Sequence, residues 1–421
     1  MPGTRVITFG CRLNAFESEL IERAVTAAGL RDAVIVNTCA VTAEAERQAR
    51  QAIRRARRHD PKAMIFVTGC AAEIAPESYA ALPEVDRVLS NREKLLSQTY
   101  LPTQAPSLPS PASGGAPRQP PARAGVPGVE WGSEGRSRAY LQVQQGCDHR
   151  CTFCVIPYGR GPSRSVPIEA ISDQARRLAA AGCPEIVLTG VDLTAYGVDL
   201  PGRPTLGEMV GCLLAEIPEI GRLRLSSLDP AEIDADFWRL LGVERRLMPH
   251  LHLSLQSGDD LILKRMKRRH SRADAIAVAR RARDLRPEMA LGADLIAGFP
   301  TETEDAFCRS LDLVAECGLA FVHVFPYSVR PGTPAARMPQ LPHQIVTERA
   351  ARLRSAAGAA LAAELSSRVG SETEVLIERP GTGRAEFYAA VGFTAPEPPG
   401  TVRRMRIVGS SAGSLVGVPA Q

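Results

Sequence analysis

Short β-branched runs alternate with helical segments along most of the chain, and this alternation constrains the fold more than any other feature. In the first hundred residues, the runs Val6 to Phe9, Ala33 to Asn37 and Met64 to Thr68 predict strands. Between them, Asn14 to Ala28 and Val41 to His59 have apolar residues at helical spacing. Strands joined by helices pair in parallel. The sequence therefore predicts a small N-terminal α/β domain with a parallel sheet.

A longer series of the same kind follows. Its six strand-like runs are Ala139 to Val143, Glu185 to Leu188, Arg222 to Leu225, His250 to Leu255, Leu291 to Ile296 and Phe321 to Phe325. Six βα repeats without a reversal of strand direction predict an incomplete parallel barrel, with its functional residues at the carboxyl ends of the strands. An alanine-rich helix from His343 to Leu365 closes this domain. After it, a small β module is predicted from the runs Glu374 to Ile377, Phe387 to Val391 and Val402 to Val408.

Proline, alanine, serine and glycine dominate from about Leu101 to Val129. Such a stretch cannot bury enough apolar surface to fold alone and is typical of a linker. We therefore expect an α/β chain in four parts: an N-terminal domain at 1–100, a linker at 101–132, a central barrel at 133–366 and a C-terminal β module at 367–421.

Composition is typical of a globular protein, with 421 residues, 44% hydrophobic and 23% charged. No apolar run is long enough to cross a bilayer, and the first residues do not resemble a signal peptide. We expect a cytoplasmic protein that does not bind membranes. The net charge of +5 permits a polyanionic partner without requiring one.

Three cysteines, Cys147, Cys151 and Cys154, have the spacing C-x-x-x-C-x-x-C. A loop this short can hold three irons of a cubane cluster and leave the fourth iron without a protein ligand. Structural zinc is the alternative, with His149 as a fourth ligand, although zinc sites normally use two well separated ligand pairs. The spacing predicts a cluster with one open iron, where chemistry can take place.

Another cysteine follows each of the first three predicted strands, at Cys11, Cys39 and Cys70. A single cysteine in such a position is most often a small buried residue. Loops at the carboxyl ends of parallel strands meet at one edge of the sheet, so three equivalent cysteines predict a shared site and favour a second iron-sulfur cluster. The other four cysteines have apolar neighbours and are interpreted as structural: Cys183, Cys212, Cys308 and Cys317.

Together these features resemble the radical S-adenosylmethionine methylthiotransferases. The resemblance covers nearly the whole chain and is carried by the cysteine triplet together with Phe9-Gly-Cys-Arg-Leu-Asn, Val36-Asn-Thr-Cys-Ala-Val-Thr, Val67-Thr-Gly-Cys and His323-Val-Phe-Pro-Tyr-Ser-Val-Arg-Pro-Gly-Thr-Pro-Ala-Ala-Arg-Met. Within that family, the stretch from Val322 to Met338 is most similar to the branch that modifies N6-threonylcarbamoyladenosine in transfer RNA.

The resemblance implies a function for both sets of cysteines. The triplet would be catalytic and hold a radical-generating [4Fe-4S] cluster whose open iron binds S-adenosylmethionine. Cys11, Cys39 and Cys70 would hold a second [4Fe-4S] cluster that carries the sulfur. The product would bear a methylthio group at C2 of the purine at position 37, next to the anticodon.

The resemblance also implies partners. They are the transfer RNA anticodon stem-loop and an electron donor such as flavodoxin or ferredoxin, and we expect a monomer. The C-terminal module would be a TRAM-like RNA-binding domain.

Several predicted strand ends, and one aromatic residue of the cysteine loop, are candidates for cosubstrate binding. Glycine allows close backbone approach, and hydroxyl, amide or carboxylate groups can bind amino, carboxylate and ribose groups. The candidates are Phe153, Thr189, Gly190, Ser226, Gln256 and Asp294. Each strand-end residue is equally consistent with a turn or a barrel layer, and Phe153 with a shield over the cluster. The segment around Gly190 departs from the Gly-Gly-Glu pattern common in the wider superfamily.

Candidate RNA contacts come from two groups of arginines, one on a predicted helix and one on a predicted C-terminal strand: Arg54, Arg55, Arg403, Arg404 and Arg406. A basic run on a helix is often only a solvated face. With an RNA substrate, phosphate contacts become the better interpretation. The C-terminal module has few aromatic residues with which to stack on bases: Phe387, Tyr388 and Phe393.

Other functions are consistent with the same residues. A related enzyme would act on isopentenyladenosine in transfer RNA or on an aspartate of a ribosomal protein. A protein of a different class would be a non-catalytic RNA-binding iron-sulfur sensor.

Overall fold

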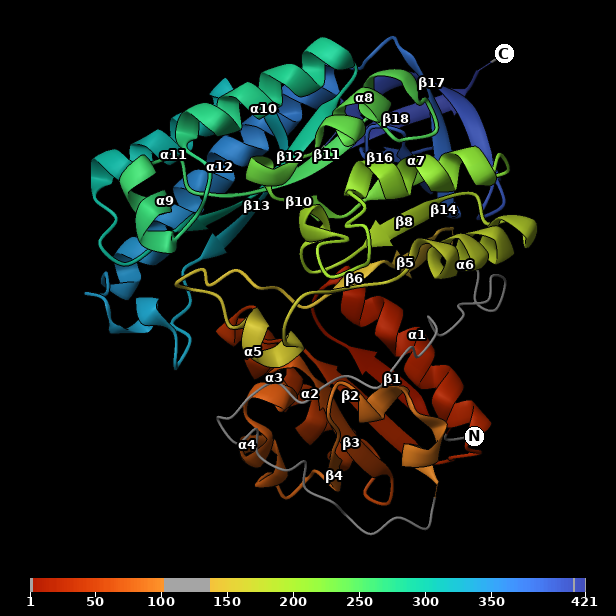
Figure 1. Cartoon of the computed structure of the whole chain (residues 1–421), viewed down its shortest axis with the longest axis vertical. Coiled ribbons are helices and arrows are strands. Elements are labelled where there is room, and N and C mark those ends of the chain that lie inside the picture. Colours follow the sequence, from red (N-terminus) through yellow and green to blue (C-terminus); the bar gives the residue numbers. More distant parts are fainter. Residues whose placement is uncertain (1–2, 102–136, 412, 421) are drawn as a thin grey trace. The chain divides into compact units, whose positions relative to one another are not determined.

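The computed structural model describes residues 3–101, 137–411 and 413–420 (Figure 1). The predicted linker at 101–132 therefore lies, except for Leu101, outside the described residues. The chain divides into two compact units. The first contains Met1–Val129, Gln145–Arg164 and Ser328–Thr333, and the second contains Glu130–Gln144, Ser165–Tyr327 and Pro334–Gln421. Among the described helices, none is both long and apolar enough to span a bilayer.

A parallel sheet forms the core of the first unit, as predicted, and it contains a fourth strand in addition to the three that were predicted. Its order is β1-β2-β3-β4. The strands are β1 (Arg5–Thr8), β2 (Ala33–Thr38), β3 (Met64–Gly69) and β4 (Arg87–Val88). The helices of this unit are α1 (Arg12–Ala27), α2 (Ala43–His59), α3 (Cys70–Ile74), α4 (Pro76–Ala80) and α5 (Ile156–Arg160), with the short 3-10 turns Glu93–Leu95 and Ser97–Tyr100.

Helices cover both faces of this sheet because side chains alternate along β2. Ile35 belongs to an apolar cluster with Ile21 of α1, whereas Val36 belongs to a second cluster with Ile53 of α2. All six residues of β2 are buried. A parallel sheet buried on both faces is expected to consist of such apolar strands.

The second unit contains the six predicted parallel strands as an open arc. One sheet holds β5 (Ala139–Gln142), β8 (Ile186–Thr189) and β9 (Leu223–Leu225). The other holds β10 (Ser227–Leu228), β11 (His250–Gln256), β12 (Ala290–Ala297) and β13 (Leu319–Pro326). β9 and β10 are parts of one chain segment interrupted at Ser226, so the order follows the sequence. This arrangement agrees with the incomplete barrel that the βα repeats predict.

Helices connect the strands of the arc, and α11 and α12 pack on β13 (Figure 1). Several begin with side-chain caps, and Thr205 with Glu208 forms a reciprocal capping box at α7. The helices are α6 (Ile168–Ala180), α7 (Leu206–Glu216), α8 (Ala235–Val243), α9 (Asp260–Met266), α10 (Arg272–Leu285), α11 (Glu304–Glu316) and α12 (His343–Ser367). Two short strands, β6 (Gln144–Gln145) and β7 (Arg164–Ser165), pair with each other.

The C-terminal module is a closed five-stranded barrel in the order β14-β15-β16-β18-β17. Its strands are β14 (Glu372–Arg379), β15 (Thr382–Ala385), β16 (Ala390–Gly392), β17 (Val402–Ser411) and β18 (Ser414–Pro419). The strand predicted at Phe387 to Val391 begins only at Ala390, because Tyr388 has a left-handed backbone (φ 77°) in the preceding turn. β15 and β18 are not among the predicted strands, because each contains a glycine that weakens the strand pattern.

A buried cluster of charges joins this barrel to the arc of strands. Glu185, whose exposed side-chain fraction is 0%, accepts hydrogen bonds from Arg138 (2.9 Å), Arg222 (3.1 Å) and Arg224 (3.0 Å). Arg138 also pairs with Glu378 of β14. Burial alone would raise the pKa of Glu185, but the three guanidinium groups outweigh it and hold the pKa well below its usual range.

We expect Glu185→Gln to destabilise the protein by about 3–5 kcal/mol at neutral pH, because three buried arginines lose their shared carboxylate. Since the folded-state pKa is depressed, the difference from wild type should shrink as the pH falls below about 5. Denaturant unfolding at several pH values measures it. Glu219→Gln, at an exposed position, is the matched control. An unfolding midpoint unchanged by Glu185→Gln at neutral pH would contradict the role of this cluster.

Candidate functional site

The three cysteine-bearing strand ends of the first unit meet at one edge of the sheet. The register places Thr8 beside Asn37 and Asn37 beside Thr68. Cys11 directly precedes α1, at its N-cap position, and Cys70 is the first residue of α3. Cys39 and Cys70 are buried at 4% exposure each, whereas Cys11 is exposed. The structure therefore brings these cysteines together, as the sequence predicts.

Backbone packing around Cys39 is close enough to require a glycine. Gly10 has a φ of +95°, and a Cβ at this position would lie 2.5 Å from Cys39 Sγ. Burial raises the pKa of Cys39 to about 12 and also raises that of Cys70. Without a metal these thiols keep their protons at neutral pH, so metal binding must displace them.

An arginine from another part of the chain reaches the third cysteine. Arg160, at the end of α5, donates from Nε to Cys70 Sγ at 3.0 Å. Its other nitrogens donate to Glu17 and to Asn14, both on α1. Lys94 Nζ donates to the same Glu17 carboxylate at 2.7 Å. No local sequence pattern marks Arg160, because its partners are distant in the sequence.

The loop with the second cysteine set runs from β6 to α5 and belongs to the first unit. Cys147, Cys151 and Cys154 are each half-buried. Gly146 has a φ of +76°, and a Cβ there would lie 1.9 Å from the Pro162 carbonyl oxygen, so only glycine fits. The Cys147 amide donates to the Gly161 carbonyl at 3.1 Å, which closes the base of the loop.

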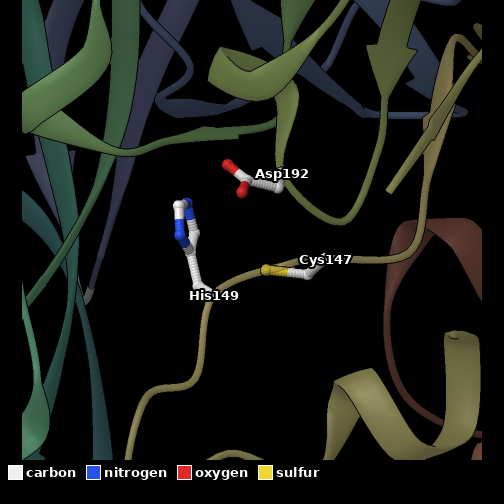
Figure 2. A group of neighbouring side chains, drawn as sticks. All are labelled: Cys147, His149 and Asp192. Carbon is white, nitrogen blue, oxygen red and sulfur yellow. The ribbon is translucent and has the colours of Figure 1, made fainter. Parts of the chain in front are cut away.

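Figure 2 shows Cys147 and His149 on this loop, where the thiol and a ring nitrogen lie within 4.8 Å of each other. Both side chains can therefore contribute to one metal site. This keeps open the zinc alternative that includes His149. Phe153 is half-buried on the same loop, and Tyr158 of α5 is exposed.

The donor atoms of both cysteine sets fit iron-sulfur clusters. Each set presents three thiols from short loops, and thiolates are the ligands that hold such clusters. The other four cysteines lie in the second unit, away from both sets in the sequence. Among them, Cys183 donates to the Glu185 carbonyl at 3.3 Å. This hydrogen bond agrees with a structural role.

Several candidate residues for cosubstrate binding lie at the ends of strands in the second unit. Thr189 is buried at the end of β8, and Ser226 donates its amide to the Leu188 carbonyl on the same strand. Among the described residues, the buried Ser226 hydroxyl has no hydrogen-bond partner. Gln256, the last residue of β11, has a φ of +69°, which is rare for a residue with a side chain.

Gly190 has a packing role of its own. A Cβ there would lie 3.0 Å from Gln144 Oε1. That oxygen accepts the amides of Val191 and Asp192 at 2.9 Å each. Asp192, also drawn in Figure 2, belongs to this loop after β8. Close packing against Gln144 accounts for Gly190 without a cosubstrate contact.

Asp294, on β12, is held by two histidines that are not among the predicted site residues. Its Oδ1 atom lies 2.8 Å from His252 Nε2 and 3.1 Å from His323 Nδ1. Burial would raise the pKa of Asp294, but the two imidazoles outweigh it and lower the pKa. The three residues could hold a divalent metal ion. The signal available in the sequence was the His-x-His pattern of β11, which places His250 and His252 on one face.

The predicted RNA contacts differ in how accessible they are. Arg54 and Arg55 are exposed on α2, and Arg55 lines a surface hollow of about 310 Å³ with Arg5 and His59. The three predicted arginines of β17, Arg403, Arg404 and Arg406, are all exposed. Two of them form ion pairs within the module: Arg403 with Glu397, and Arg404 with Glu372.

The aromatic residues of the C-terminal module are engaged in packing. Phe387 and Phe393 are buried in the barrel core. Tyr388 stacks on His250, with 4.5 Å between the ring centroids. In this structure these rings do not form an exposed platform for bases.

Two family models match the chain. Residues 4–90 match the family described as uncharacterized protein family UPF0004, and residues 141–314 match the radical SAM superfamily. The fold is also similar to that of a radical S-adenosylmethionine methyltransferase, TsrM from Kitasatospora setae. That likeness has a TM-score of 0.52 at 17% identity, covering 77% of this chain and 68% of the other.

Relatives with closely similar sequences extend over nearly the whole chain. The threonylcarbamoyladenosine tRNA methylthiotransferase MtaB of Rickettsia prowazekii is 47% identical over 97% of this chain and 96% of its own. The protein of the same name from Bacillus subtilis is 34% identical over 92% and 87%. A tRNA-2-methylthio-N(6)-dimethylallyladenosine synthase from Erythrobacter litoralis is 34% identical over 98% and 96%. The chain belongs to the radical S-adenosylmethionine methylthiotransferase family.

We expect Gly10→Ala to lower the iron bound by Cys11, Cys39 and Cys70, because the added methyl group displaces the Cys39 thiol. Iron per chain is measured after anaerobic reconstitution in a C147A/C151A/C154A background, where this set alone remains. Gly29→Ala is the matched control, since Gly29 also has a positive φ (+67°) but no atom within 4 Å of the Cβ position. Equal iron in both variants would show that this contact is unimportant for the site.

Proposed function

We propose that this chain transfers a methylthio group to C2 of N6-threonylcarbamoyladenosine at position 37 of transfer RNA. The observation that carries the proposal is the presence of two three-thiol sets within one compact unit: Cys11, Cys39, Cys70, Cys147, Cys151 and Cys154. A protein that only sensed redox state would need one cluster and no cosubstrate. Family membership adds the expected reaction type.

In the proposed reaction, each cysteine set would hold one [4Fe-4S] cluster. When bound, the clusters and S-adenosylmethionine supply the radical and the sulfur that no side chain can provide. The residues of the chain bind and orient these groups. Two strand-end residues are best supported as cosubstrate contacts. The buried hydroxyl of Ser226 has no hydrogen-bond partner among the residues that the structure describes, and Gln256 has a strained backbone.

The choice of base within transfer RNA rests on similarity. The relative at 47% identity carries a threonylcarbamoyladenosine name. Two dimethylallyladenosine synthases, from Erythrobacter litoralis and Novosphingobium aromaticivorans, each cover 98% of this chain but are only 34% and 33% identical. Both groups act on transfer RNA according to their names, which favours an RNA over a ribosomal-protein substrate.

Contacts to this RNA would be made mainly through phosphates. Arg54, Arg55 and Arg406 are exposed and their charges can neutralise phosphates. Phe387 and Phe393 are buried in the barrel core, which keeps these two rings from stacking on bases. We also propose an electron donor of the flavodoxin or ferredoxin class. The sequence-based limits at 1–100, 133–366 and 367–421 are proposed as domain boundaries.

We predict that Cys39→Ala will lower bound iron from about eight to about four per chain, as expected for the loss of one of two cubane clusters. Methylthio transfer should stop, while reductive cleavage of S-adenosylmethionine to deoxyadenosine should continue. Iron analysis and product chromatography on anaerobically reconstituted protein measure both. Cys212→Ala, outside both sets, is the control and should keep about eight irons. Normal transfer by Cys39→Ala would refute the second cluster.

A separate prediction concerns the substrate. Transfer RNA from cells lacking this protein should lose the methylthio derivative of threonylcarbamoyladenosine and keep that of isopentenyladenosine. Mass spectrometry of digested nucleosides measures both, and expression of the wild-type chain, but not of the Cys39→Ala variant, should restore the loss. The reverse pattern would assign the chain to the isopentenyladenosine branch.

A further inference from the structure

Among the described residues, the buried and hydrogen-bonded charges beside Cys70 do not sum to zero. Arg160, Lys94 and Glu17 have side chains exposed by 1% or less. Two of these groups are cations and one is a carboxylate, so the hydrogen-bonded network has an excess of one positive charge. A buried charge without a partner is strongly unfavourable, which implies that an anion belongs beside this network.

Cys70 is the place where such an anion would lie. Its sulfur accepts the Arg160 Nε hydrogen bond at 3.0 Å, and the Arg160 charge also acts on Cys11. A cluster held by three thiolates would bring negative charge to this position. The excess positive charge and the three converging thiols are therefore complementary.

We propose that Arg160 raises the reduction potential of the cluster held by Cys11, Cys39 and Cys70, and that Glu17 moderates this effect. The inference rests on the second cluster of the proposed function. Reduction adds one negative charge to a cluster. Hydrogen bonds to sulfur and nearby positive charge stabilise that added charge and are among the factors that set cluster potentials.

The geometry requires an arginine more than a generic cation. One edge of the guanidinium bonds the Glu17 carboxylate through two nitrogens while Nε points to sulfur. Lysine has no such planar fork and cannot hold both partners in fixed directions. Asn14, which accepts from Arg160 Nη2, also donates to the Phe9 and Thr38 carbonyls beside the cysteine loops.

The position of Arg160 in the sequence connects the two cysteine sets. It lies on α5, which directly follows the loop of Cys147, Cys151 and Cys154. The neighbouring Gly159 is so close that a Cβ there would lie 3.2 Å from the Cys70 carbonyl oxygen. The segment that carries one ligand set therefore supplies the charge beside the other, and residues 1–100 alone would lack it.

The test is an EPR-monitored redox titration of the full chain in the C147A/C151A/C154A background. Arg160→Gln removes one positive charge, and we expect at least a tenfold decrease in the equilibrium constant for reduction, which is about 59 mV for one electron. Glu17→Gln removes the negative charge and should shift the potential in the opposite direction. Arg160→Lys keeps the charge and should shift it less than Arg160→Gln.

Two further variants separate charge from structural damage. The double variant Glu17→Gln/Arg160→Gln restores the net charge of the network and should have a potential between those of the single variants, even if Arg160→Gln alone fails to fold. Arg31→Gln, at an exposed position, should change nothing.

Different results would overturn the role of Arg160 alone or the second cluster as well. Equal potentials in the parent, the Glu17→Gln variant and the double variant, with full iron in each, would overturn the role of Arg160 and leave the proposed function intact. If Arg160→Gln and Glu17→Gln shifted the reduction potential in the same direction, the role of Arg160 would also be overturned and the proposed function would remain. No iron in the parent protein would overturn the second cluster and this inference together.

Discussion

Every strand of the N-terminal sheet runs in the same direction, and the parallel pairing of β1, β2 and β3 fixes where their cysteine loops can lie. The hydrogen-bond register aligns Thr8, Asn37 and Thr68, so the residues that follow leave the sheet at one edge. Glycine at position 10 then allows one loop to approach another closely. The convergence of three thiols thus follows from strand direction, register and one residue without a side chain.

Charges buried behind those thiols are the second determinant of the site. Glu17 is surrounded by Arg160 and Lys94, which keep its pKa below the usual range although burial by itself would raise it. Hydrogen bonds of this network also link α5 to α1, and α5 contacts α3. In the second unit, Glu185 has the same relation to its three arginines, and there the charges join the arc of strands to the C-terminal barrel. In each unit, one buried carboxylate is therefore shared by two or more cations.

Much of the fold could be predicted because apolar periodicity and strand direction are local properties. All nine strands expected in the sheet and the arc are present, with ends that differ by a few residues. The C-terminal module was less predictable: β15 and β18 each contain a glycine and lack a strong pattern, and Phe387 lies in a turn instead of a strand. The cysteine triplet was predicted as a cluster site from its spacing, and the other set was predicted because each of its members follows a strand. His252, His323 and Arg160 could not be assigned, because their partners Asp294 and Glu17 come from distant segments.

The sequence by itself determined the class of fold, the two sets of cysteines and the family, because each depends on periodicity, spacing or motif within short segments. Only the tertiary structure decided which polar groups share buried space. It placed Arg160 against Cys70, gave Asp294 two imidazole partners and packed Tyr388 against His250. These choices depend on burial, where a charge or a donor needs a partner regardless of its distance along the chain. A linear pattern carries no information on that requirement.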